Sequence, residues 1–188
     1  KADIECAMVV LGSGPGGYTA AFRAADVGLD TVLVERYESL GGVCLNVGCI
    51  PSKALLHASH LLHETHENFD KMGLTGAHVT VDWTKMQGYK AETVGGNTKG
   101  IEFLFKKNKV TTIMGEARLV APGKVSVKTD KGTEEVTAKS IVLATGARAR
   151  ELPGLEPDGK LVWNYKHALV PPHMPKKLLV IGSGAIGI

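Results

Sequence analysis

The fold of this chain is decided by one stretch, residues 7–17, which reads AMVVLGSGPGG. Its first five residues are continuously apolar, as in a parallel strand that is buried on both faces. The glycine-rich turn opens an alanine-rich helix over residues 18–27, and Gly28 marks the end of that helix. A second apolar strand over residues 31–34 then ends at Glu35. This order of elements predicts a Rossmann-like α/β dinucleotide-binding unit with a parallel sheet.

The glycine turn and Glu35 have separate physical tasks in such a unit. Gly12 allows a tight turn, Gly14 lets the backbone approach a pyrophosphate, and Gly17 lets the helix pack closely on the strand. The helix N-terminus then faces the phosphates. A carboxylate at Glu35 accepts hydrogen bonds from a ribose, and the alternative is an ordinary charge at the end of a strand. The nucleotide contacts expected here are Gly12, Ser13, Gly14, Pro15, Gly16, Glu35 and Arg36.

Two cysteines, Cys44 and Cys49, follow in the segment GGVCLNVGC at residues 41–49. Their sulfurs meet only if the chain folds back or forms about one helical turn, which the glycines of the segment allow. A disulfide that closes so small a loop removes little chain entropy, so it suits redox cycling better than structural cross-linking. A structural zinc site needs a second pair of ligands, and none follows. Two unrelated buried thiols remain the alternative, and the third cysteine, Cys6, is expected to be a small buried apolar residue.

The two cysteines also help to decide which dinucleotide binds at this first site. FAD and NAD bind to the same fold. A nicotinamide transfers hydride only, whereas a flavin exchanges electrons with a disulfide sulfur, and Cys44 follows Glu35 closely in the sequence. We therefore expect FAD at this first site.

The segment GGVCLNVGCIPSKALL, residues 41–56, resembles the active-site segment of the dihydrolipoamide dehydrogenases. These are the E3 components of 2-oxo acid dehydrogenase complexes, in the pyridine nucleotide-disulfide oxidoreductase family. Val43 departs from the commonest residue, threonine, in the manner of bacterial members. The resemblance implies that Cys49 is the thiol next to the flavin and that Cys44 exchanges with dihydrolipoamide. The start of a helix at Cys49 agrees with this assignment, because a helix N-terminus stabilises a thiolate.

The resemblance extends over the whole chain and implies further contacts with FAD. Lys53 is expected near the flavin N5, and its alternative is a solvated lysine at a helix start. Gly115 to Ala117 resemble a backbone contact with the adenine. Thr145 and Gly146 resemble the family's segment beside FAD, with a plain exit from a strand as the alternative. The contacts implied beyond the glycine turn are Gly41, Gly42, Val43, Cys44, Gly48, Cys49, Lys53, Gly115, Glu116, Ala117, Ala144, Thr145 and Gly146.

The middle of the chain predicts helices followed by a meander. Histidines recur every three residues on the helix after Cys49, at His57, His60, His63 and His66. Each step falls short of a full turn by roughly 60°, so these side chains cannot converge on one ion, and no metal site is expected. Residues 81–107 form a second helical stretch that returns antiparallel to the first. Strands are expected over residues 109–120, 124–129 and 134–144, as a three-stranded meander that covers the FAD sheet in the family.

A second glycine turn closes the chain. Residues 177–181 read as a buried strand and run into GSGAIG at residues 182–187. This pattern predicts the start of a second Rossmann-like domain, which the resemblance assigns to NAD, with an incomplete site. Both ends of the sequence read as cut, so we expect the N-terminal portion of a longer protein. The expected NAD contacts are Gly182, Gly184, Ala185 and Ile186. The expected domains are a FAD-binding domain with the redox disulfide at 1–150, a linker at 151–175 and the NAD-domain start at 176–188.

Composition excludes several other classes of protein. The 22 basic and 19 acidic residues leave a net charge of only +3, and aromatic residues make up 5%, so no nucleic-acid surface is expected. No apolar stretch is long enough to cross a membrane. With three cysteines, a secreted disulfide framework is not expected, and we predict a cytoplasmic protein.

The resemblance implies a function for the whole protein. It is a flavoprotein that oxidises dihydrolipoamide to lipoamide with NAD through FAD and the disulfide, and this chain is its FAD-binding part, inactive alone. The implied partners are the acyltransferase of a 2-oxo acid dehydrogenase complex and a second copy in a homodimer. The alternatives are a related disulfide reductase, of the glutathione or mercuric type, and a flavin-binding module without turnover of its own.

Overall fold

The computed structural model describes residues 2–76 and 78–187, and the chain divides into two units, one up to Ala147 and one from Arg148. The expected domain boundaries at residues 1 and 188 lie outside the described residues. The elements of the first unit are β1 Ile4–Leu11, α1 Pro15–Asp26, β2 Thr31–Glu35, α2 Gly42–Val47, α3 Cys49–Glu67, a short 3-10 helix Asp70–Met72, α4 Trp83–Lys107, β3 Thr111–Met114, β4 Glu116–Ala121, β5 Lys124–Thr129 and β6 Gly132–Leu143. The second unit contains α5 Tyr165–Leu169.

A six-stranded mixed sheet organises the first unit, in the order β3-β2-β1-β6-β5-β4. The strands β3, β2, β1 and β6 run parallel, whereas β4, β5 and β6 form an antiparallel meander. The long strand β6 belongs to both parts: Val136 pairs with Ile4 of β1 and with Val125 of β5. The predicted α/β fold, with a parallel sheet and a meander, is confirmed.

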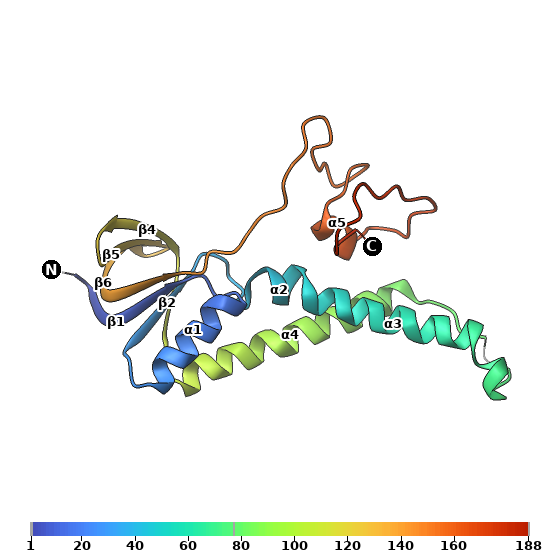
Figure 1. Ribbon diagram of the computed structural model, residues 1–188, viewed down its shortest axis with the longest axis horizontal. Coiled ribbons are helices and arrows are strands. Elements are labelled where there is room, and N and C mark those ends of the chain that lie inside the picture. Colours follow the sequence, from blue (N-terminus) through green and yellow to red (C-terminus); the bar gives the residue numbers. More distant parts are fainter. Residues whose placement is uncertain (1, 77, 188) are drawn as a thin grey trace. The chain divides into compact units, whose positions relative to one another are not determined.

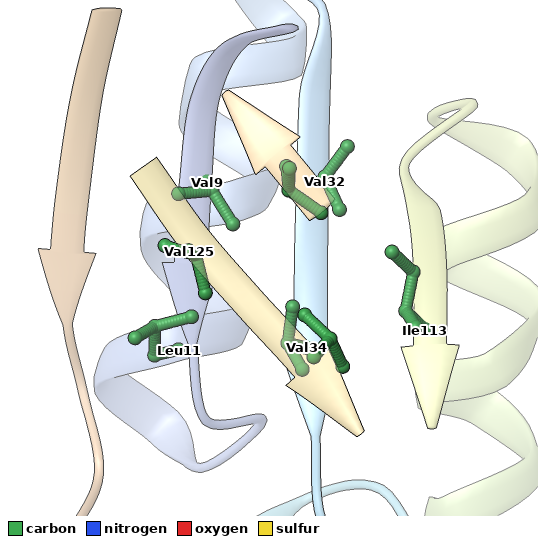
Figure 2. Packing of buried hydrophobic residues seen from close by; sticks show 8 residues of the cluster. Val9, Leu11, Val32, Val34, Ile113 and Val125 are labelled. Atoms are coloured by element: carbon green, nitrogen blue, oxygen red, sulfur yellow. The ribbon is translucent and has the colours of Figure 1, made fainter. Parts of the chain in front are cut away.

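The core explains why β1 is continuously apolar. Alternate residues of β1 point to opposite faces of the sheet, and both faces are covered. Val9 and Leu11 pack with β2, β3 and the valines of β5, and Figure 2 shows β5 crossing in front of β1 and β2, with Val125 beside Val9 and Leu11. Val10 faces the other way and packs in a cluster with Leu33 of β2 and Phe105 of α4. The parallel strands are therefore a middle layer between the meander and the helices α1 and α4.

One predicted strand proves to be two. The expected strand over residues 109–120 is divided at Gly115 into β3, which pairs with β2, and β4, which pairs with β5. The Gly115 N donates to the Glu35 carbonyl oxygen over 2.7 Å, and a Cβ on this glycine would lie 2.6 Å from the Lys128 carbonyl oxygen. Only a glycine lets the backbone pass through this narrow place, where the chain leaves the parallel sheet for the meander.

The helices α3 and α4 lie side by side and antiparallel, as predicted (Figure 1). Asp82 is the N-cap of helix α4, and its Oδ1 accepts from the Lys85 N over 3.0 Å. The helix continues through four glycines without a break. A Cβ on any of them would meet no atom within 4 Å; these glycines are Gly88, Gly95, Gly96 and Gly100. Packing among the residues that the structure describes therefore does not require glycine there.

The second unit departs from the prediction at residues 177–181, where the expected strand is absent. No strand among the described residues pairs with this segment, and its apolar side chains are exposed, with Leu179 84% accessible. An apolar run becomes a strand only when neighbouring strands take its backbone hydrogen bonds.

Within residues 2–76 and 78–187, no helix is long and apolar enough to span a bilayer.

Candidate redox and nucleotide site

The first glycine turn, between β1 and α1, is enclosed by backbone. Gly12 has a φ of +104°, and a Cβ there would lie 2.3 Å from the Ala144 carbonyl oxygen. A Cβ on Gly17 would lie 1.8 Å from the Gly12 carbonyl oxygen. The structure thus brings the turn against Ala144, the residue after β6. Gly12 makes the tight turn expected of it, and Gly17 lets the helix pack closely on the turn.

The N-terminus of α1 remains open on the other side of this turn. Gly14 is its N-cap and supplies no side chain, so no side-chain hydrogen bond caps the helix. Around Gly16 a Cβ would meet no atom within 4 Å. Backbone N–H groups without a side-chain cap and the positive end of the helix dipole suit an anionic group such as a diphosphate.

Ser13 and Glu35 contact each other directly. Ser13 is fully buried, and its backbone N and Oγ both donate to Glu35 Oε2, over 2.8 and 2.6 Å. The other carboxylate oxygen accepts from the backbone N of Arg36 and of Tyr37, over 2.8 and 3.0 Å. The two predicted nucleotide contacts therefore also join the end of β2 to the glycine turn.

The segment that carries the cysteines packs against this turn. The Gly41 N donates to both the carbonyl oxygen and Oγ of Ser13, each over 3.1 Å. Gly42 has a φ of +64°, and a Cβ there would lie 2.5 Å from the Gly14 Cα. The backbones of the two segments therefore meet without side chains between them. This contact places the start of α2 next to the first glycine turn.

Asn46 organises the same segment and is not among the residues predicted from the sequence. Its Nδ2 donates to the carbonyl oxygens of Leu40 and Gly42, both over 3.0 Å, and its Oδ1 accepts from Ser39 Oγ over 2.8 Å. A side-chain amide among three glycines is a signal for such a contact, because it can bind backbone groups that no regular element satisfies. The Tyr37 hydroxyl, at the surface beside this segment, accepts from the Arg36 guanidinium over 2.7 Å.

The two cysteines lie on adjacent helices and interact. Cys44 belongs to α2, and Cys49 is the first residue of α3, as expected for a thiol at a helix N-terminus. Both are free thiols, and Cys49 is the more exposed of the two. The pKa of Cys44 is raised by its hydrogen bond with the Cys49 side chain, then by burial and by the charge of Cys49; the Lys53 ammonium acts in the opposite direction.

An open hollow of about 610 Å³ borders Cys44. Its lining comes from α1, the two cysteine-bearing helices and α4, and includes Tyr18, Glu92 and Asn97. Cys49 does not line it. The hollow therefore places a partly polar cavity next to Cys44.

The other predicted site residues divide between the two units. Gly115 lies beside Glu35, and the backbone at Thr145 follows Ala144 past the glycine turn. The four expected NAD contacts belong to the second unit, where Gly182 has a φ of +110°. In the part of the chain that the structure describes, no three histidine, cysteine or acidic side chains are grouped as metal ligands.

Comparisons with known proteins agree with this arrangement. Residues 7–188 match the protein family described as pyridine nucleotide-disulphide oxidoreductase. The chain is 51% identical over 183 residues to a dihydrolipoyl dehydrogenase of Trypanosoma brucei brucei and 50% identical over 182 residues to one of Zymomonas mobilis. It is 48% identical to a leghemoglobin reductase of Vigna unguiculata.

These matches cover nearly all of this chain but only part of each relative. They extend over 96% of the chain, and over 38%, 39% and 35% of the three relatives. The identity is similar for the trypanosomal, bacterial and plant proteins. With its dinucleotide-binding fold, its paired cysteines and a family match over almost its whole length, this chain belongs to the pyridine nucleotide-disulphide oxidoreductases.

Proposed function

We propose that this chain is the FAD-binding part of a dihydrolipoyl dehydrogenase that uses NAD. The observation that carries the proposal is the packing of the dithiol segment on the nucleotide turn, through Gly41 on Ser13 and Gly42 on Gly14. A redox dithiol fixed beside a dinucleotide site suits electron transfer between the two. Relatives named dihydrolipoyl dehydrogenase, at 47 to 51% identity, support this choice of substrate.

The residues at the glycine turn fit the adenosine diphosphate half of FAD. The open N-terminus of α1 suits the diphosphate, the backbone at Gly14 allows close approach, and Glu35 suits the ribose. Lys53 and the two cysteines would lie toward the flavin ring. When bound, FAD supplies the acceptor for the electron pair of the dithiol.

The chemistry at the cysteines is thiol–disulfide exchange. A thiolate of dihydrolipoamide attacks the Cys44 sulfur of a Cys44–Cys49 disulfide; the S–S bond breaks and Cys49 leaves as a thiolate. The second substrate thiol then displaces Cys44 from the mixed disulfide, which releases lipoamide. The substrate loses two electrons, and the protein disulfide gains them. The hollow beside Cys44 supports its assignment as the substrate-facing thiol, and the start of α3 supports Cys49 as the stabilised thiolate.

The finer features of the protein follow from the same assignment. We propose a FAD-binding domain at 1–150, a linker at 151–175 and the start of an NAD-binding domain at 176–188. We also propose a homodimer in the cytoplasm that serves the acyltransferase of a 2-oxo acid dehydrogenase complex. A chain with only three cysteines supports a reducing compartment.

Turnover by the native protein that contains this chain tests the proposal. We expect NAD-dependent oxidation of dihydrolipoamide, its loss in Cys44→Ser and in Cys49→Ser, and its retention in Cys6→Ser. Faster reaction with glutathione or mercuric ion than with lipoamide would contradict the substrate. A second measurement separates the cysteines: the long-wavelength thiolate-to-flavin absorbance of the reduced protein should disappear in Cys49→Ser and persist in Cys44→Ser, and the opposite result would exchange their roles.

A further inference from the structure

The hydrogen bonds around Ser13 carry a further inference, which rests on the proposed binding of an adenosine ribose at Glu35. The backbone N and Oγ of Ser13 donate to one carboxylate oxygen, Glu35 Oε2, over 2.8 and 2.6 Å. A hydroxyl has one hydrogen, so in its other contact, 3.1 Å from the Gly41 N, Oγ accepts. Ser13 thus joins the carboxylate to the N-cap of α2.

The Glu35 carboxylate is fully engaged by four donors of this chain. Oε1 accepts from the backbone N of Arg36 and of Tyr37, and Oε2 accepts from the two groups of Ser13. A carboxylate offers about four lone-pair positions. Only 5% of Glu35 is exposed. A ribose hydroxyl therefore binds this carboxylate only when one of the four donors gives way.

Three of the four donors are backbone amides, whose positions are set by β2 and by the glycine turn. The fourth, the Ser13 hydroxyl, rotates about a single bond. When it turns away from Glu35, its oxygen still accepts from the Gly41 N, so the contact with α2 remains. We propose that the Ser13 hydroxyl is the donor that a ribose hydroxyl replaces on Glu35 Oε2, and that Ser13 thereby sets the discrimination between ribose and deoxyribose nucleotides.

ADP is a suitable probe, because FAD and NAD both contain adenosine diphosphate. Titration calorimetry on the flavin-free native protein compares ADP with 2′-deoxy-ADP and 3′-deoxy-ADP, and the ADP binding that Glu35→Gln weakens is assigned to this site. Each analogue gives one ratio, its dissociation constant divided by that of ADP, and the larger of the two ratios measures the discrimination against a missing ribose hydroxyl. In Ser13→Ala the ribose hydroxyl no longer competes with a protein donor, so we expect this ratio to increase about fivefold.

Ser39→Ala is the matched control. Ser39 Oγ is partly buried in the same region but donates to Asn46 and not to Glu35, so its removal should leave the ratio unchanged. A merely structural loss in Ser13→Ala would weaken the binding of ADP and of both analogues alike. An unchanged or smaller ratio in Ser13→Ala therefore overturns the inference.

The wild-type protein separates this inference from the proposed function. If neither the wild type nor Ser13→Ala distinguishes ADP from either analogue, the ribose role of Glu35 fails, and the inference fails with it. If the wild type distinguishes them and Ser13→Ala does not change the ratio, only the role of Ser13 fails. Should Ser13→Ala not fold, Ser13→Gly removes the same hydroxyl, and the same increase is expected.

Discussion

The two glycine turns of this chain have nearly the same sequence but different surroundings. The first reads GSGPGG from Gly12 and the second GSGAIG from Gly182. Their backbones begin alike, with φ of +104° at Gly12 and +110° at Gly182. A Cβ on Gly12 would collide with the Ala144 carbonyl oxygen, whereas a Cβ on Gly182 would meet no atom within 4 Å. The backbone conformation of the turn is therefore set by its own local sequence. The close packing around the first turn comes from the neighbouring strands of the sheet.

The difference extends to the elements on either side. The first turn follows a strand with parallel neighbours on both sides and precedes a twelve-residue helix. The second follows residues 177–181, which form no strand and expose their apolar side chains. A binding site needs a fixed backbone, so the first turn, joined to Glu35 and to α2, is the better formed of the two.

The largest effect is expected from adding a methyl group where the first turn is tightest. In Gly17→Ala the new Cβ would lie 1.8 Å from the Gly12 carbonyl oxygen, and backbone on both sides cannot yield. We expect the free energy of unfolding to fall by about 3 kcal/mol or more in urea denaturation. Gly16→Ala, whose Cβ meets nothing within 4 Å, should change it by less than about 1 kcal/mol. Equal tolerance of both variants would contradict the enclosure of this turn.

The residues around this turn show what the sequence can predict. The strand at Val9 and Val10, the glycine turn and the acid at Glu35 follow a continuous pattern in which each part favours the next, and the structure forms them all. The helix that begins at Cys49 is predicted equally well. These elements depend on residues close in sequence and on a shared need to bury apolar faces.

Other features depend on residues far apart in sequence and could not be predicted. The break at Gly115 arises because the Glu35 carbonyl oxygen and the Lys128 backbone both crowd it, while residues 109–120 alone read as one strand. The buried contacts of Ser13 fall on a position that the motif leaves variable. The segment 177–181 has the composition of a strand, but composition does not supply a pairing partner.

A smaller effect tests the connection between the first turn and β2. Glu35→Gln replaces one acceptor oxygen with an amide group, which then faces two donors in either orientation. Because the Ser13 donors are buried and the Arg36 and Tyr37 donors are partly buried, we expect a loss of about 2 kcal/mol in the free energy of unfolding. Glu38→Gln, on the exposed segment nearby, should change it by less than about 0.5 kcal/mol. Similar values for both variants would show that the carboxylate does not hold the turn.

A smaller effect concerns the dithiol that packs on the first turn. Hydrogen bonding with Cys49 is the main cause that raises the pKa of Cys44, so at neutral pH less Cys44 thiolate is present than for an ordinary thiol. Cys49→Ala removes this cause, and the pKa of Cys44 should fall. Alkylation of reduced protein by iodoacetamide, mapped by mass spectrometry, should then be about threefold faster at Cys44 near pH 8.

Substitution of Lys53 is the control, because it should change the pKa of Cys44 in the opposite direction. Its ammonium charge lowers the pKa of Cys44, so Lys53→Met should slow the same alkylation at the same pH. The rate profiles of the three proteins should therefore be displaced along the pH axis in the order Cys49→Ala, wild type, Lys53→Met. A rate at Cys44 that does not respond to either substitution would show that the two thiols are independent.

The smallest effect is expected at the second turn, and it isolates the contribution of the surroundings. Gly12→Ala and Gly182→Ala replace the first glycine of the same Gly-Ser-Gly sequence, and both force alanine to a positive φ, which costs about 1–2 kcal/mol locally. Only at Gly12 does the Cβ also collide with the Ala144 carbonyl oxygen, at 2.3 Å. The stability of the sheet can be measured by urea denaturation of the 188-residue chain, with hydrogen exchange of the β1 amides as the readout. In this measurement Gly182→Ala should change the free energy of unfolding by less than about 0.5 kcal/mol. Gly12→Ala should lower it by about 3 kcal/mol, the sum of strain and collision. Equal losses would mean that the backbone conformation alone, and not its enclosure by the sheet, makes these glycines necessary.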